Sequence, residues 1–373
     1  MLRPHRLAVG FYDEDPATGK IVRTDRFELD VDGESTVVAA AAGKKRPAFI
    51  LVNDDDLTYT KLRFDADSLS FALANLQHFD DALARAVVWL SLWDMTRDGD
   101  LAAEKFIDTT LALLATETES TTFRYALSCM STTAWHYTAP DRRADVVKHV
   151  AKELWKLVIA APGGSDQQFQ LVTAYLGYGE EGDAEFAEHA QGLFDGSLIV
   201  AGLEIDNNFT WTIINALSSV KLIDQAGIDA QLAKRDTTEN REFALGAHAV
   251  RGDAAAKEWA WNEALNNADL TNMQLEAVAR GFGATPRPDL AEPYAAKYYD
   301  VVDWVWKNKS FHMAEALLEG LYPYYADPAT LVELGHRWLA DHEDADNALK
   351  RIVRGNVESS QRTLKVRDFN AAL

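Results

Sequence analysis

Residues Ile50–Asp65, ILVNDDDLTYTKLRFD, mark the point at which the pattern of this sequence changes. The residues before this stretch form short β-branched and aromatic runs separated by turn-forming clusters, which is typical of strands. After Asp65, apolar residues recur every three or four positions, a spacing typical of amphipathic helices. The stretch therefore predicts a boundary between a strand-rich segment, residues 1–65, and a helical segment, residues 66–373.

The strand-rich segment predicts a small β-sandwich, or part of a larger one. The clusters DEDPATGK and VDGE contain turn-forming residues and separate the first three runs. The candidate strands are His5–Tyr12, Ile21–Val31, Ser35–Ala40, Phe49–Val52 and Tyr59–Phe64. The second of these runs has an imperfect alternation of apolar residues, which predicts a strand with one wet face and a bulge.

The helical pattern is clearest in DDALARAVVWLSLWDM, where Asp80 or Asp81 can cap the start of a helix. Its apolar positions fall on one predicted stripe, formed by Leu83, Val87, Leu90 and Trp93. Gly, Pro and acidic turn residues close each further segment. The predicted helices are 67–76, 80–97, 101–116, 120–137, 142–160, 166–176, 183–194, 207–222, 228–235, 237–250, 254–267, 272–280, 289–307, 311–321, 329–340 and 344–368.

Many short helices joined by short connections favour helix pairs stacked in a row, as in HEAT or armadillo arrays. The helix-turn-helix cadence recurs at roughly forty residues, without a strict period of identical residues. We therefore predict a mainly α fold, an irregular α-superhelix of HEAT- or armadillo-like helix pairs preceded by a small, truncated β-sandwich. A stack of this kind has a concave face, and that face is where we expect a ligand.

The balance of charged residues excludes two classes of partner. The chain has 37 Lys and Arg residues against 58 Asp and Glu residues, and its formal net charge is −21. Such a charge repels phosphate backbones and anionic lipid, so neither nucleic acid nor a membrane is an expected partner. A local acidic cavity that attracts cationic peptide ends is compatible with the same composition.

The sequence also predicts a soluble, cytoplasmic protein. Its one cysteine, Cys129, cannot form a disulfide within the chain. The N-terminus has too short an apolar run for a signal peptide. Apolar stretches such as Val87–Trp93 are far shorter than the roughly 20 residues that a membrane span requires.

No sequence signature of catalysis is present. None of the nine histidines begins a His-Glu-x-x-His zinc motif. The pairs His149/Glu153 and His312/Glu315 have spacings that share a helical face, and we interpret them as surface pairs rather than metal ligands. Gly177–Gly182, GYGEEG, matches a dinucleotide fingerprint but follows a predicted helix, so we interpret it as a helix-ending turn. We assign no catalytic residue and no metal ligand.

Three further features favour structural roles. Cys129 lies in an apolar helical stretch, where a free cysteine is usually buried. The ten tryptophans, with the close pairs Trp259/Trp261 and Trp304/Trp306, are expected to pack helices rather than stack on nucleic acid. The basic clusters are expected to be solvated faces or helix ends, the alternative being capture of a peptide carboxylate. They are Lys44–Arg46, Arg142–Arg143, and Lys350, Arg351, Arg354, Arg362, Lys365 and Arg367.

The stretch ILVNDDDLTYTKLRFD resembles the junction between the β-sandwich and the C-terminal helical domain of zinc aminopeptidases of the aminopeptidase N type, the gluzincin family. The segments RPHRLAVGFYD and ALARAVVWLSLWDMTRDG are similar to the actinobacterial branch. The resemblance continues through NNFTWTIINAL, AAKEWAWNEAL, YYDVVDWVWKNKSFHMAEALLEGLYP and ALKRIVRGNVESSQRTLKVRD, so it covers nearly the whole chain. The resemblance leads us to expect Leu-Arg-Trp in relatives where this chain has Phe209, Thr210 and Trp211.

This resemblance implies a non-catalytic C-terminal region. The family places its zinc ligands, its general-base glutamate and its recognition site for the free amino terminus in preceding domains. The expected parent is a zinc-dependent aminopeptidase that removes N-terminal residues from peptides, with zinc in its catalytic domain and no cofactor in this chain. The expected partners are that upstream domain and the peptide. The helical segment would enclose the active-site cavity and control access, and its peptide-binding residues are unknown from sequence.

Two expectations remain open at this point. The opening strand, His5–Tyr12, is expected to leave an exposed sheet edge that upstream sequence would otherwise cover. The alternative function is a free-standing helical-repeat scaffold that binds a protein partner through its concave face.

Overall fold

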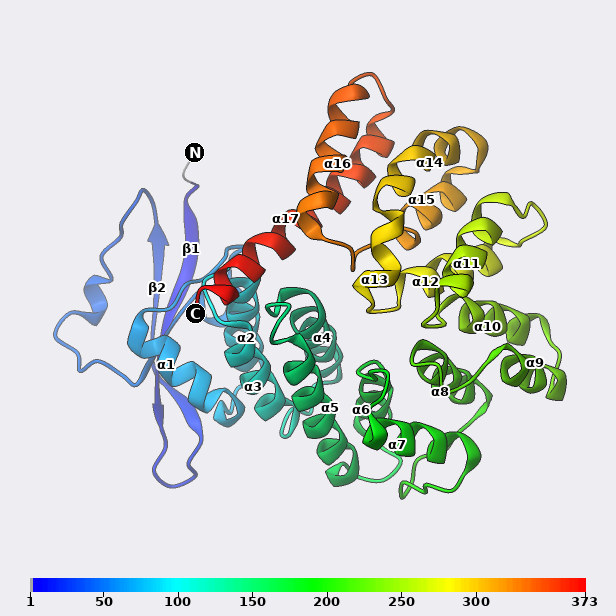
Figure 1. Ribbon diagram of the computed structural model, residues 1–373. Helices are drawn as coiled ribbons and strands as arrows, with labels where there is room; N and C mark the ends of the chain where they lie inside the picture. Colours follow the sequence, from blue (N-terminus) through cyan, green and yellow to red (C-terminus); the bar gives the residue numbers. More distant parts are fainter. Residues whose placement is uncertain (1–2) are drawn as a thin grey trace. The chain divides into compact units, whose positions relative to one another are not determined.

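A computed structural model describes residues 3–373 and shows three strands followed by a long series of helices (Figure 1). The strands are β1 (His5–Glu14), β2 (Ile21–Val31) and β3 (Phe49–Val52). The helices are α1 (Ala66–Asn75), α2 (Ala82–Arg97), α3 (Ala103–Leu114), α4 (Ser120–Thr132), α5 (Arg143–Ala160), α6 (Asp166–Leu176), α7 (Ala184–Asp195), α8 (Asn207–Ser219), α9 (Gln225–Lys234), α10 (Thr238–Ala249), α11 (Ala254–Asn266), α12 (Asn272–Gly283), α13 (Pro288–Ala291), α14 (Ala295–Asn308), α15 (Phe311–Gly320), α16 (Pro328–Asp341) and α17 (Asn347–Ala371). The predicted mainly α fold is confirmed.

The strands form one antiparallel sheet in the order β2-β1-β3. Val9 of β1 lies opposite Phe27 of β2 and Val52 of β3, and the register shifts between Phe11 and Tyr12. The bulge predicted for the second strand is therefore present in the pairing of β1 with β2. The alternation of β1 places Leu7, Val9 and Phe11 in one apolar cluster, while Tyr12 packs with the aromatic rings of Phe49 and Phe79.

Three expectations about this segment are wrong. Ser35–Ala40 forms no strand and ends in a 3-10 turn, and Tyr59–Phe64 also forms no strand. Val38 packs on the cluster formed by Leu7, Val9 and Phe11, so it covers the sheet, whereas Val37 is 83% exposed. Residues 3–373 thus contain one sheet and no second sheet facing it. Strand β1 is also central in the sheet, because β2 pairs with it along His5–Glu14 and β3 pairs with Val9–Tyr12 on its other side.

The acidic run at the end of β3 is a structural turn. Asn53, Asp55 and Asp56 have positive φ angles of 60°, 64° and 50°. Asn53 stabilises the turn by accepting a bond from the Thr58 amide at 3.0 Å. Asp54 is buried and accepts a 2.6 Å hydrogen bond from the Tyr12 hydroxyl and a 2.7 Å bond from Arg23. These bonds fix the end of the sheet ahead of α1, whose first amides donate to the Asp65 carboxylate.

Most predicted helices are present, with two corrections. The range 289–307 divides into α13, a 3-10 turn and α14, because Pro293 has no N–H to continue the α-helical ladder. Asp81 caps α2 as predicted, but the predicted stripe of α2 is only half right. Leu83 and Leu90 are 46% and 41% exposed, because the buried face of α2 is turned towards Val88 and Leu92.

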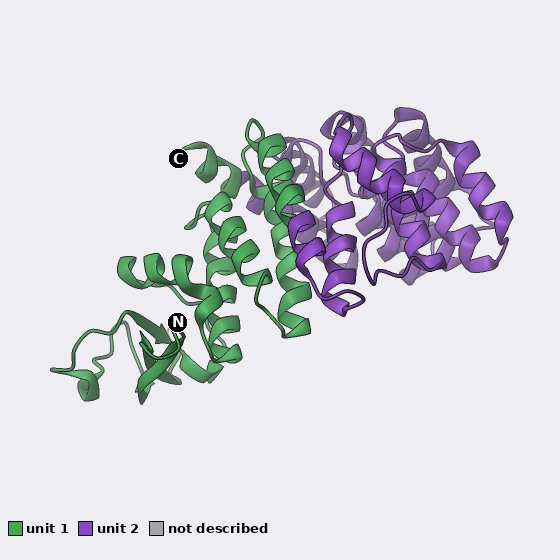
Figure 2. Cartoon of the chain, turned by 90° about the horizontal axis from the view of Figure 1, so that it is seen from below, with its two compact units in different colours: residues 1–153, 365–373 green, residues 154–364 purple. Residues whose placement is uncertain are grey.

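The described chain forms two compact units (Figure 2). The first contains the residues up to Glu153 together with Lys365–Leu373, so it includes the sheet and the first helices. In this unit the C-terminal segment binds a π-helical turn, since Arg367 donates a 2.7 Å bond to the His136 carbonyl. Burial lowers the pKa of His136 to about 3, so its ring is neutral.

The second unit, Leu154–Leu364, contains the helix pairs that the sequence predicts. Helices α6, α8, α10, α12 and α15 contact one another in succession and form one row, while α7, α9, α11 and α14 pack against this row. Two glycines allow neighbouring helices of this row to approach each other closely. A Cβ on Gly281 would lie 2.6 Å from the Gly246 oxygen, and one on Gly320 would lie 2.7 Å from the Ala279 Cβ.

Candidate functional site

The row of helices in the second unit carries a groove, which we call the α10–α12–α15 groove. It consists of two adjoining hollows of about 310 Å³ and about 360 Å³ that share Glu276 and Arg280. The first hollow is also lined by Asn215, Glu242, Phe243, Gly246, Val250, Met273, Ala277, Gly281 and Ala284. The second is also lined by His312, Glu315, Ala316, Glu319 and Gly320. Hollows of this size are large enough to receive side chains of a ligand.

Helical periodicity explains why these residues share one surface. On α12, Met273, Glu276 and Arg280 are spaced by three and four residues, so they lie on one face. The same spacing aligns His312, Glu315 and Glu319 along α15. A capping box at Thr271 fixes where α12 starts, and the side chain of Ser310 caps α15.

The charged groups of the groove are only partly paired. His312 Nε2 lies 2.9 Å from Glu276 Oε1, and Arg280 reaches the other Glu276 oxygen at 3.7 Å. Arg351 approaches Glu315 at 3.9 Å, with a side chain that is 74% exposed. Exposed pairs of this length contribute little, so the groove keeps a surplus of carboxylate charge.

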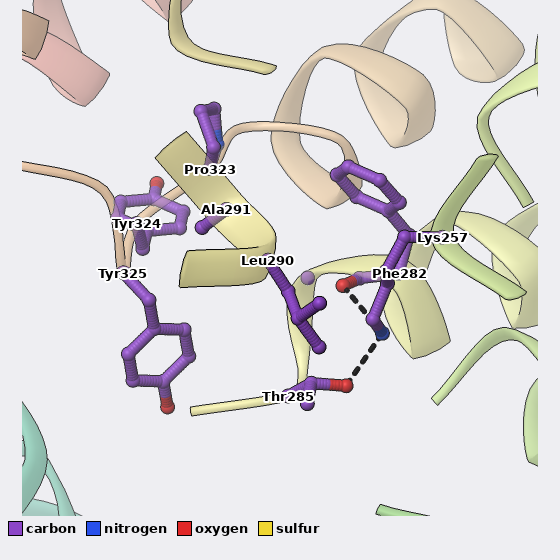
Figure 3. A pocket seen from close by; sticks show the side chains of 9 residues that line it. Lys257, Phe282, Thr285, Leu290, Ala291, Pro323, Tyr324 and Tyr325 are labelled. Carbon is purple, nitrogen blue, oxygen red and sulfur yellow. Dashed lines mark hydrogen bonds between the residues drawn. The ribbon is translucent and has the colours of Figure 1, made fainter. Parts of the chain in front are cut away.

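A second, small cavity is lined in part by Lys257, the buried lysine of α11 (Figure 3). The Lys257 ammonium donates to the Ala249 carbonyl at 2.7 Å, to the Phe282 carbonyl at 3.1 Å, and to the Thr285 hydroxyl. The Thr285 hydroxyl donates its own proton to the Val250 carbonyl at 2.7 Å, so the Thr285 oxygen acts as the acceptor in its bond with Lys257. Desolvation lowers the pKa of Lys257 to about 7.

The lysine cavity is structural. Its volume is about 10 Å³, which is enough for a single water molecule. Lysine bonds the last carbonyls of α10 and α12, which is a favourable position for a cation because helix C-termini carry partial negative charge. Lys257 therefore joins three helices and has no room for a substrate.

Both histidines singled out in the sequence lie close to a carboxylate of another helix. His149 Nε2 lies 3.1 Å from Asp108, and His312 pairs with Glu276 instead of Glu315. In each case the partner comes from another helix, which sequence spacing alone does not reveal. The described residues contain no group of three His, Cys, Asp or Glu side chains arranged to hold a metal ion.

Two other sequence interpretations are confirmed. Gly177–Gly182 lies between the end of α6 and the start of α7 and is a turn, with no preceding strand. Cys129 is 3% exposed in α4, and burial raises the pKa of its thiol to about 12. The thiolate that a nucleophile requires is therefore disfavoured.

The basic clusters have structural partners. Lys44 pairs with Asp25, Arg142 with Glu104, and the guanidinium of Arg367 bonds a backbone carbonyl.

Most tryptophans pack helices as expected, including the buried Trp89, Trp93, Trp211, Trp261 and Trp338, whereas Trp304 is 43% exposed.

Comparison with known proteins places the groove inside a recognised domain. Residues 49–362 match the family described as the ERAP1-like C-terminal domain. The chain belongs to this family. It is also 34% identical, over 371 residues and its whole length, to aminopeptidase N of Streptomyces lividans. The chain spans 43% of the length of that relative, so it corresponds to the C-terminal domain of an aminopeptidase N-like protein.

The match to the ERAP1-like C-terminal domain begins at β3 and ends within α17, so it includes every helix of the groove. The sequence did not identify the groove. The available signal was weak: carboxylates at helical spacing on α12 and α15, such as Glu315 and Glu319, which are also typical of solvated faces. Among the described residues, no helix has both the length and the apolar content to cross a bilayer.

Proposed function

We propose that this chain is the non-catalytic C-terminal region of a zinc aminopeptidase that removes N-terminal residues from peptides. Its role is to form part of the wall of the active-site cavity and to control which peptides enter. The peptide-facing surface of this wall is the α10–α12–α15 groove. The upstream catalytic domain and the peptide substrate are the two partners.

The observation that carries this proposal is the match along the whole chain to an aminopeptidase N that is more than twice as long. The groove supports it, because its two hollows are far larger than the Lys257 cavity and are lined by polar and apolar side chains together. The described residues contain no group of three His, Cys, Asp or Glu side chains that could hold a metal ion. Chemistry supplied by a separate domain accounts for both facts.

Three finer points belong to the same proposal. Zinc would be held in the catalytic domain of the parent protein and not by this chain. Strands of that protein would complete a sandwich around the β2-β1-β3 sheet. A cytoplasmic location is favoured by the sequence, whose one cysteine provides no disulfide.

A free-standing scaffold that binds a protein partner is the weaker alternative. It explains the helical row, but it gives no reason for 34% identity with an aminopeptidase across both the sheet and the helices.

The test compares two substrates of the full protein that contains this chain. One is a chromogenic aminoacyl amide, and the other is an extended peptide with the same N-terminal residue. Ala284→Trp places a bulky ring in the first hollow, because Ala284 is an exposed residue of its lining. We expect it to lower the ratio of kcat/KM for the peptide to kcat/KM for the amide severalfold.

The matched control is Ala329→Trp on α16, an equally exposed alanine outside the groove. We expect this variant to leave the ratio unchanged. If the full protein hydrolyses neither substrate in the presence of zinc, the proposed activity is wrong. If both variants change the ratio equally, the groove is not the peptide-facing surface.

A further inference from the structure

The charged side chains of the α10–α12–α15 groove favour one class of ligand. Four glutamates line it, Glu242, Glu276, Glu315 and Glu319, and the basic side chains among its lining residues are Arg280 and His312. All of these residues lie within the unit Leu154–Leu364, so the groove is complete without the rest of the chain. A guest that carries positive charge is therefore favoured over an anionic one.

The structure leaves much of this negative charge uncompensated. Glu242 and Glu319 form no ion pair with any residue between positions 3 and 373. Among the described residues, Glu315 has only the long ion-pair contact to Arg351, whose side chain is mostly exposed. A cation bound in the second hollow would lie between the carboxylates of Glu276, Glu315 and Glu319 and would not have to displace a short ion pair from the last two.

The first hollow also contains a buried hydrogen-bond acceptor without a donor. Asn215 of α8 lines it, and the Asn215 Oδ1 atom is buried without a hydrogen-bond partner in the part of the chain described. A buried acceptor without a partner costs about 1–3 kcal/mol, so such atoms are normally satisfied by a ligand or water. The neighbouring acceptors are the carboxylates of Glu242 and Glu276. This end of the groove therefore offers mostly acceptors to a guest.

The apolar lining suits a long aliphatic stem. Met273 is 56% exposed at the edge of the first hollow, and Phe243, Ala277 and Ala284 complete its apolar wall. Lysine and arginine bury their methylene groups against such surfaces while their charged ends reach polar groups. A peptide with a lysine or arginine side chain meets both requirements, whereas a small inorganic cation would leave the apolar wall unused.

We propose that the α10–α12–α15 groove binds a lysine or arginine side chain of the peptide substrate, at a position distant from the residue being removed. This inference rests on the proposed function, since it needs a peptide in the cavity. It adds a preference for cationic peptides that arises in this chain and not in the catalytic domain. The carboxylates of Glu315 and Glu319 contact the cation, and the first hollow holds the stem and the adjoining backbone.

The experiment uses the full protein and two peptides that differ at one internal position, lysine in one and norleucine in the other. We expect the full protein to give a lower KM for the lysine peptide, and we expect added salt to reduce this difference because it screens partly exposed charges. Replacing two partly exposed carboxylates, in Glu315→Gln with Glu319→Gln, should raise the KM for the lysine peptide roughly three- to tenfold. The KM ratio of the two peptides cancels any effect common to both.

The control is Glu258→Gln, which removes one exposed carboxylate of α11 outside the groove and should leave the KM ratio unchanged. Equal KM values for the two peptides in an active protein would overturn the inference and leave the proposed function standing. A lysine preference that survives the double substitution would also overturn it. Absence of aminopeptidase activity would overturn both.

Discussion

Replacing Lys257 by methionine tests how the second unit is held together. Met removes the ammonium but keeps a side chain of similar length, so the ends of α10 and α12 lose their shared donor. Two effects oppose one another at neutral pH. The substitution relieves the burial of a charge, and it leaves the Ala249 and Phe282 carbonyls without a partner. The dependence on pH separates these effects.

The magnitude follows from the pKa of Lys257. Burial lowers it to about 7 in the folded protein, from an ordinary value of 10.5. Between these two values the unfolded chain binds more protons than the folded chain, so the free energy of unfolding rises with pH. The penalty of the buried charge is fully present below the folded pKa and is lost by the unfolded pKa. The rise is at most about 1.4 kcal/mol per pH unit, or about 2–3 kcal/mol between about pH 7.5 and 9.5.

The assay is urea unfolding followed by tryptophan fluorescence at several pH values in this range. We expect the difference in unfolding free energy between the unsubstituted protein and Lys257→Met to grow with pH, because other titrating groups cancel in the comparison. Lys307→Met, which removes an exposed lysine of α14, should show no such trend. Parallel curves for the unsubstituted protein and Lys257→Met would refute the reasoning. They would show that the surrounding carbonyls fully offset the burial of the charge.

Two further predictions concern stability. Glu117→Ala should lower the free energy of unfolding by about 3 kcal/mol, since it leaves the Arg85 guanidinium, 2.8 Å from Glu117 and 11% exposed, without its carboxylate; a urea midpoint equal to that of the unsubstituted protein would contradict this. Gly281→Ala should lower Tm, because the added Cβ would meet the neighbouring backbone at 2.6 Å. Gly355→Ala is the matched helical control, where a Cβ meets nothing within 4 Å, and it should raise stability by about 1 kcal/mol. Scanning calorimetry distinguishes these opposite signs, and two changes of the same sign would show that close packing at Gly281 is not limiting.

The sequence predicted the classes of element well because they depend on local periodicity. Apolar spacing located nearly all helices, and the turn at Gly177–Gly182 was identified from the helix before it. The predictions failed where contacts with distant parts of the chain decide the conformation or the burial of a residue. The apolar residues of Ser35–Ala40 suit a strand, yet Val38 covers the sheet because it packs on the cluster around Leu7. Leu83 and Leu90 fit a helical stripe but lie on the exposed side of α2.

The α10–α12–α15 groove could not be predicted from the sequence for a related reason. Its residues come from α8, α10, α12 and α15, and each helix contributes only a few carboxylates or small side chains. Taken singly, Glu242 or Glu319 is an ordinary surface residue. His312 shows the difficulty most plainly, because its nearest carboxylate in sequence is Glu315 but its partner in space is Glu276.

The sequence by itself determined the change from strands to helices after Asp65, the absence of known catalytic motifs and the excess of negative charge. These properties reside in composition and in spacing along one helix or strand, so no long-range contact is needed to recognise them. Only the tertiary structure decided that β1 is central in its sheet, that Lys257 joins three helices, and that glutamates of separate helices line one groove. Each depends on which elements pack together, and packing joins residues whose distance along the chain carries no periodic signal.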